Sequence, residues 1–147
     1  MEVVRTIDLP CDIDRAWAVL TDWERQASWM RDADRVTVTS VAREGIGVRL
    51  AVRTRLFGIP AFTEPMEVTA WEPPRHLALR HGGPVSGEGA WTLAPVPGAT
   101  RFTWTERVRL GMPVVGGVAA WCYRPLLAWL MGGALRELRD EVARGGA

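Results

Sequence analysis

Polar and apolar residues alternate with a period of two through the middle of the chain, from residue 35 to residue 110. This period is typical of β-strands that bury one face and expose the other. Turn-forming residues interrupt it five times and delimit six strands: Gly45, Gly58-Ile59-Pro60, Pro73-Pro74, Gly82-Gly83-Pro84 and Pro97-Gly98. With a further β-branched run at residues 3–9, the pattern predicts seven strands. One dry and one solvated face indicates an antiparallel sheet.

The C-terminal residues 118–143 predict one long helix. In its second half Leu135, Leu138 and Val142 recur at spacings of three and four among charged residues, which is an amphipathic pattern. Its first half, residues 118–134, is apolar almost all round and is therefore expected to be buried on most sides. Pro125 is expected to kink this helix or to begin a new turn, because proline removes one backbone hydrogen bond.

A membrane span must be weighed for residues 110–135, since this run contains a single charge, Arg124. It exceeds the roughly 20 residues that cross a bilayer. Two prolines, the central arginine and the glycines at positions 116, 117, 132 and 133 oppose a span. A helix buried against the predicted sheet is favoured, because the sheet's apolar face needs a cover.

Two short helices are predicted between the first strand and the other six. Asp12 is the expected N-cap of the first helix. Thr21 and Glu24 have the spacing of a capping box for the second, with the intervening aspartate as a competing cap. Two tryptophans, Trp23 and Trp29, are expected to anchor this helix at the rim of the interior.

Together these elements predict an α+β fold, in which a curved seven-stranded antiparallel sheet is covered by the long C-terminal helix. Four segments then carry a resemblance to a known family: IDLPCDIDRAWAVLTDWERQASWM, VTAWEPPRHLALR, GEGAWTLAPVPGATRFTWT and RPLLAWLMGGALRELRDEV. In their order and spacing the chain resembles the START-like (SRPBCC) superfamily of helix-grip proteins, and within it the polyketide cyclase/dehydrase and lipid-transport group. The resemblance covers nearly the full length and implies a single START-like domain over residues 1–147. It also implies a deep cavity between sheet and helix that holds a lipid, sterol, polyketide or quinone.

Three polar side chains share the phase of the dry face: Glu64, His81 and Glu106. Burying such groups without partners costs about 1–3 kcal/mol each. If all three side chains face one cavity, they predict a proton-transfer site. There His81, or a carboxylate of raised pKa, removes a proton from the carbon next to a ketone. The alternative is that the glutamates lie in solvent or pair with arginines, and that His81 lies in a turn.

Aromatic and aliphatic residues in the same phase, or on the apolar helix, are the candidate ligand contacts. The composition is unusual in having eight tryptophans and one tyrosine, which is a large amount of aromatic surface to bury in a core or expose to a ligand. Gly87 and Gly89 also share the inward phase, where they either leave room for a ligand or mark bulges. The candidate contacts are Trp91, Trp104, Phe102, Phe62, Met66, Leu79, Trp121 and Trp129.

The net charge of +1 predicts no polyanionic partner, and the outward arginines lack the interleaved aromatics that stack nucleic-acid bases. Cys11 and Cys122 have no metal-ligand spacing, and no secretory signal is apparent, so a cytoplasmic protein without metal or cofactor is expected. Three functions stay open, in this order. They are a carrier or binding module for a hydrophobic small molecule, a cofactor-free cyclase/dehydratase, and a lipid- or quinone-binding accessory protein that contacts a membrane surface. Whether the protein is an enzyme is left open.

Overall fold

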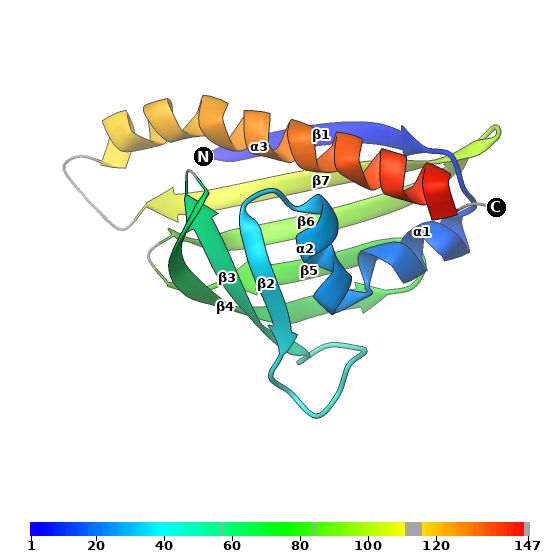
Figure 1. Ribbon diagram of the computed structural model, residues 1–147, viewed down its shortest axis with the longest axis horizontal. Coiled ribbons are helices and arrows are strands. Elements are labelled where there is room, and N and C mark those ends of the chain that lie inside the picture. Colours follow the sequence, from blue (N-terminus) through cyan, green and yellow to red (C-terminus); the bar gives the residue numbers. More distant parts are fainter. Residues whose placement is uncertain (57, 84, 111–115, 146–147) are drawn as a thin grey trace.

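The computed structural model describes residues 1–56, 58–83, 85–110 and 116–145 (Figure 1). The strands are β1 (Glu2–Leu9), β2 (Ala33–Val38), β3 (Arg49–Leu56), β4 (Ile59–Glu72), β5 (His76–His81), β6 (Val85–Val96) and β7 (Ala99–Leu110). The helices are α1 (Ile13–Leu20), the 3-10 turn η1 (Trp23–Arg25), α2 (Gln26–Trp29) and α3 (Gly116–Gly145). The predicted order of one strand, two short helices, six strands and a long helix is confirmed.

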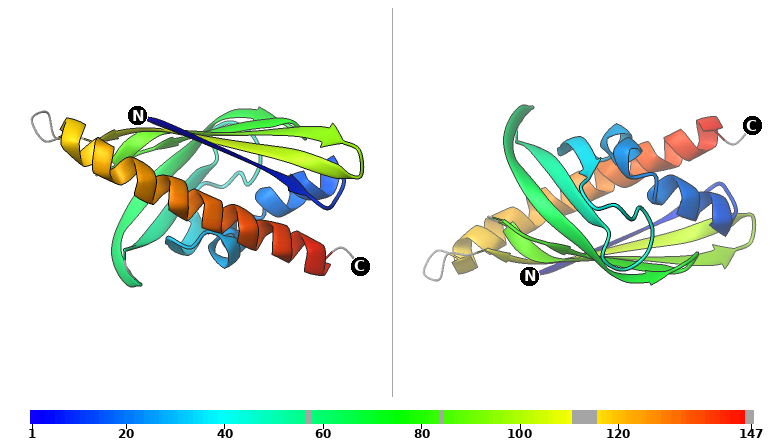
Figure 2. Two further views of the ribbon diagram at one scale, coloured as in Figure 1. Left: turned by 90° about the horizontal axis from the view of Figure 1, so that it is seen from above. Right: turned by 90° about the horizontal axis from the view of Figure 1, so that it is seen from below.

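All seven strands form one antiparallel sheet in the order β1-β7-β6-β5-β4-β3-β2. The first strand, β1, therefore forms one edge of the sheet and lies beside the last strand, β7. Register shifts interrupt the pairing of β2 with β3, of β3 with β4 and of β4 with β5. Such irregularities increase strand twist and bending. Figure 2 shows the outcome, in which β2, β3 and part of β4 turn away from the plane of β5, β6 and β7 and form a concave wall.

Helix α3 closes this concave side. It packs along β1 and makes further contacts with β7 and α2 (Figures 1 and 2). The amphipathic pattern of its second half is confirmed, since Leu135, Leu138 and Val142 are all buried. The helix continues through Pro125. In the part of the chain that the structure describes, no helix combines the length and the hydropathy needed to cross a membrane.

The first half of α3 differs from the prediction of burial on most sides. Trp121 is 80% exposed and Trp129 is 59% exposed. Only one side of this half faces the rest of the protein, through residues such as Leu127 and Met131, and the opposite side meets solvent. The first half of α3 is therefore buried on one side only, although its sequence is apolar almost all round.

The segment after β1 is held by local hydrogen bonds. The Asp12 carboxylate accepts a hydrogen bond from the Arg15 N–H at 2.8 Å, which confirms Asp12 as the N-cap of α1. The capping box predicted at Thr21 is wrong, because the Thr21 hydroxyl instead donates to the Trp17 carbonyl at 2.8 Å at the end of α1. Helix α2 is then fixed to α3, since the Ser28 hydroxyl donates to the Glu141 carboxylate at 2.9 Å.

Tryptophans form the centre of the core rather than its rim. Trp23 and Trp29 are each only 1% exposed, which corrects the prediction that they lie at the edge of the interior. The Trp29 ring packs 6.1 Å from Trp91 and 6.2 Å from Trp104. These tilted and edge-on arrangements are the ones that aromatic quadrupoles favour. The short helix α2 is thereby anchored onto the concave face of β6 and β7.

Candidate functional site

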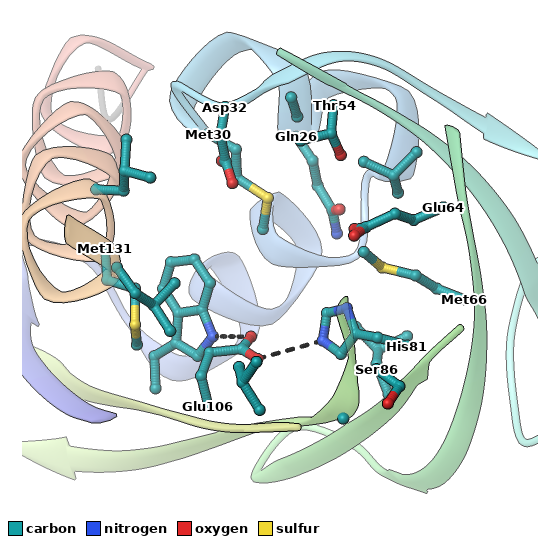
Figure 3. A pocket seen from close by; sticks show the side chains of 18 of the residues that line it. Gln26, Met30, Asp32, Thr54, Glu64, Met66, His81, Ser86, Glu106 and Met131 are labelled. Carbon is teal, nitrogen blue, oxygen red and sulfur yellow. Dashed lines mark hydrogen bonds and ion pairs between the residues drawn. The ribbon is translucent and has the colours of Figure 1, made fainter. Parts of the chain in front are cut away.

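A cavity of about 200 Å³ lies between the concave face of the sheet, α2 and the inner side of α3 (Figure 3). Most of its walls are apolar side chains, among them Met30, Phe62, Met66, Leu127 and Met131. An apolar cavity of roughly 150 Å³ is large enough to bind benzene. The space here therefore admits a molecule that contains at least one ring.

Ionisable side chains from five separate segments face this cavity. They are Asp32 from the loop after α2, Glu64 from β4, His81 from β5, Glu106 from β7 and Tyr123 from α3. Figure 3 shows the three carboxylates and the imidazole directed toward the same space. The three residues predicted from strand phase are thus brought together, and the structure adds two more.

His81 and Glu106 meet across the intervening strand β6. His81 Nε2 lies 3.3 Å from Glu106 Oε2, within ion-pair distance (Figure 3). Gly89 on β6 is paired with Glu106 on β7, and it lies beneath this contact. A Cβ atom at Gly89 would lie 2.7 Å from Glu106 Oε1 and 3.2 Å from His81 Nε2. The missing side chain at Gly89 therefore makes room for the ion pair, and β6 shows no bulge here.

Glu106 is fixed by a second partner. The indole N–H of Trp104 donates to Glu106 Oε1 at 2.7 Å, and both side chains are buried. Burial lowers the pKa of His81, but the adjacent Glu106 carboxylate and the more distant Glu64 and Asp32 outweigh it, so the pKa of His81 is raised overall. The imidazole is accordingly biased toward its cationic form. The alternative of a glutamate paired with arginine in solvent does not hold for Glu106.

Glu64 is 8% exposed and forms no ion pair within the described residues. Burial is the main cause that raises the pKa of Glu64 to about 7. The imidazole of His81 lowers it in part, while Asp32 and Glu106 raise it further. Near neutral pH this carboxyl group is populated in both forms, which is the property required of a general acid or base.

Sequence reasoning missed Asp32 and Tyr123. Burial raises the pKa of Asp32, and burial together with the nearby carboxylates raises the pKa of Tyr123 to about 12. Tyr123 had a detectable signal, because it precedes Leu127 and Met131 by four and eight residues and so shares their face of the helix. Asp32 had none, since it lies in a loop where no periodicity applies. Its carbonyl is tied to the sheet by the Arg55 N–H at 2.6 Å.

The predicted ligand contacts divide into three groups. Five line the cavity: Phe62, Met66, Leu79, Trp91 and Trp104. Phe102 is fully buried but does not line the cavity; its ring packs edge-on against that of Trp91, with 5.9 Å between ring centroids. Trp121 and Trp129 point outward from α3, so the expectation that they contact a ligand in the cavity does not fit their positions. Within the described residues, no group of His, Cys, Asp and Glu side chains has the arrangement of a metal site.

Comparisons with known proteins agree with this architecture. The family model described as polyketide cyclase / dehydrase and lipid transport matches residues 1–144. No curated protein sequence matches the chain. Among solved structures, TTHA0849 from Thermus thermophilus is similar with a TM-score of 0.82, 21% identity and 100% of both chains covered. The Zhui aromatase/cyclase from Streptomyces sp. R1128 is similar with a TM-score of 0.78 and 16% identity, over 100% of this chain and 96% of that one.

A START superfamily protein from Mycobacterium smegmatis is also similar, with a TM-score of 0.71 and 16% identity over 98% of this chain and 94% of that one. Identities this low show the fold alone, and that fold is the predicted helix grip.

Proposed function

Because the chain belongs to the polyketide cyclase/dehydrase and lipid transport family, we propose that it binds a hydrophobic small molecule in the cavity between the sheet and α3. One observation carries this proposal, namely a mostly apolar cavity of about 200 Å³ that a few polar side chains line. Such a combination favours binding, because apolar walls contribute about 25 cal/mol per Å² of buried ligand surface while a few polar groups set orientation.

This location of the binding site can be tested by placing a larger side chain on the side of α3 that faces the cavity. Leu127 lines the cavity, so Leu127→Trp should occupy the space that a ligand needs. Trp121→Leu on the exposed side of the same helix is the matched control. Native mass spectrometry and organic extraction of each purified protein measure any bound molecule, and circular dichroism verifies folding. A molecule retained equally by the folded Leu127→Trp variant would refute this location.

A second candidate function is proton-transfer catalysis of the cyclase/dehydratase kind. Glu64 and the His81–Glu106 pair favour it, because a pure carrier needs only volume and apolar walls. In such a reaction Glu64 would take a proton from the carbon next to a ketone. The resulting enolate carbon would then bond to a second carbonyl carbon, and protonation of the new oxygen followed by loss of water would complete the change. These steps need acid and base groups, which side chains supply.

Proton abstraction can be tested without knowing the natural substrate. 2-Tetralone is a bicyclic ketone whose α-hydrogens exchange with deuterium in D₂O when a base removes them, and proton NMR follows the loss of signal. We expect the protein to accelerate this exchange and Glu64→Gln to abolish the acceleration. Glu67→Gln removes a carboxylate from the opposite face of β4 and should leave the exchange unchanged. Exchange that stays fast in Glu64→Gln assigns the base elsewhere.

A further inference from the structure

The charges around the cavity are unbalanced. The chain has 18 arginines and no lysine, and none of these arginines is among the described residues that line the cavity. Three carboxyl groups face it, from Asp32, Glu64 and Glu106. The one nearby cation among those lining residues is the imidazole of His81, which already lies 3.3 Å from Glu106. A ligand that enters this space therefore meets more negative than positive charge.

We infer that the cavity selects its ligand by charge, taking hydrophobic amines as ammonium ions against Glu64 and Asp32 and rejecting hydrophobic carboxylates. The inference rests on the proposed binding function and specifies the chemical class of the ligand.

Glu64 is the group that an ammonium ion suits best. Its side chain is buried, points into the cavity and forms no ion pair within the described residues (Figure 3). A buried carboxylate is costly unless a positive charge or hydrogen-bond donors compensate it. An ammonium group supplies both, with one positive charge and three N–H donors. A neutral hydroxyl supplies one donor and no charge, so it should bind less tightly.

Further acceptors lie around the same space. Asp32 contributes a second carboxyl group on the side of α2 (Figure 3). Gln26 lines the cavity and donates its amide N–H to the Leu20 carbonyl at 3.0 Å, and within the described residues its side-chain carbonyl oxygen has no hydrogen-bond donor. The Tyr123 hydroxyl lines the α3 side. Acceptors from three segments therefore surround Glu64, which matches a donor-rich ligand group.

An anionic ligand meets the opposite situation. Its carboxylate would face Asp32 and Glu64, and the nearest cation, His81, would have to leave Glu106. Glu106 would then keep the Trp104 N–H as its remaining partner. Like charges that are brought together in a buried site disfavour the charged forms, so the ligand or the protein must take up a proton before the acid binds.

Three probes that share one ring system test the inference: 2-naphthylmethylamine, 2-naphthylmethanol and 2-naphthoate. Isothermal titration calorimetry at about pH 8, where the amine and the acid are both charged, gives the three dissociation constants. We expect the amine to bind at least about tenfold more tightly than the carboxylate, which is the effect of one modest charge interaction. The alcohol should lie between them. The affinity for the amine should fall as the pH is lowered through 7, because Glu64 becomes protonated there.

Glu64→Gln and Asp32→Asn should each reduce the amine-to-carboxylate ratio, Glu64→Gln to within about threefold. Glu67→Gln, on the outer face of the same strand as Glu64, should leave the ratio unchanged. Equal affinity for all three probes would overturn charge selection while the binding function stands. Tighter binding of the carboxylate would also overturn it. No binding of any probe to the folded protein would refute the proposed function, and the inference with it.

Discussion

Replacing Glu64 by glutamine should stabilise the protein at neutral and higher pH. In the folded protein burial raises the pKa of Glu64 from its ordinary 4.5 to about 7. The folded state therefore holds a proton between these two pH values that the unfolded state releases. Stability falls as the pH rises through this window, since the unfolded state binds fewer protons there. Above about pH 7 the ionised carboxylate destabilises the fold, and glutamine removes that charge.

The magnitude follows from the same two values. A pKa of about 7 against 4.5 corresponds to at most about 3 kcal/mol, at about 1.4 kcal/mol per pKa unit. Local relaxation and solvent screening reduce the cost of a buried charge, so we expect a gain of about 1–3 kcal/mol at pH 8. At about pH 4 the Glu64 carboxyl group is protonated in both states, and the gain should vanish.

Urea unfolding followed by tryptophan fluorescence measures these differences at the two pH values. Glu67→Gln is the control, because Glu67 is partly exposed and forms a surface ion pair with Arg80 at 3.0 Å. Such pairs contribute about 0–1 kcal/mol, so this variant should be neutral or slightly destabilised at pH 8. A Glu64→Gln variant that gains nothing at pH 8, or gains equally at pH 4, would show that burial does not hold the Glu64 pKa high.

Three further changes test the neighbouring contacts. Glu106→Gln should lower the pKa of His81, because burial then acts without its main opposing charge. An NMR titration of the His81 imidazole in both proteins measures this, and an unchanged pKa would contradict the pairing. Gly89→Ala should destabilise the protein by about 1–3 kcal/mol in urea, since its Cβ would lie 2.7 Å from Glu106 Oε1. Gly132→Ala should instead stabilise it by about 0.5–1 kcal/mol, because the nearest atom to its Cβ is 3.6 Å away within α3. A lower melting temperature for Gly132→Ala would contradict that reasoning.

Strand periodicity was sufficient to predict the sheet and three of the five ionisable side chains that face the cavity. Glu64, His81 and Glu106 lie on strands and share the phase of apolar neighbours two residues away, so their direction followed from position in the sequence. The register shift between β4 and β5 comes after Glu64 and does not reverse its face. Asp32 was beyond such reasoning, because a loop residue is directed by tertiary contacts.

The errors on α3 have a different origin. The sequence around an apolar residue such as Trp121 does not show whether other elements will cover its side of the helix. That depends on how far the sheet and the short helices extend around α3. The sheet and α2 cover one side of α3, and Trp129 lies on the other. The sequence likewise placed Trp23 and Trp29 at a rim, because a pattern of apolar positions does not reveal depth within a core.

The position of β1 beside β7 has a consequence for how the chain is made. Glu2 on β1 contacts Arg107 on β7, 105 positions later, so the first strand has no partner until nearly the whole sheet has been synthesised. At about 5–20 residues per second, a ribosome leaves β1 unpaired for roughly 5–20 s. The concave apolar face stays uncovered longer still, until α3 emerges. In the nascent chain the apolar concave face of the sheet is therefore exposed to solvent until α3 has been synthesised.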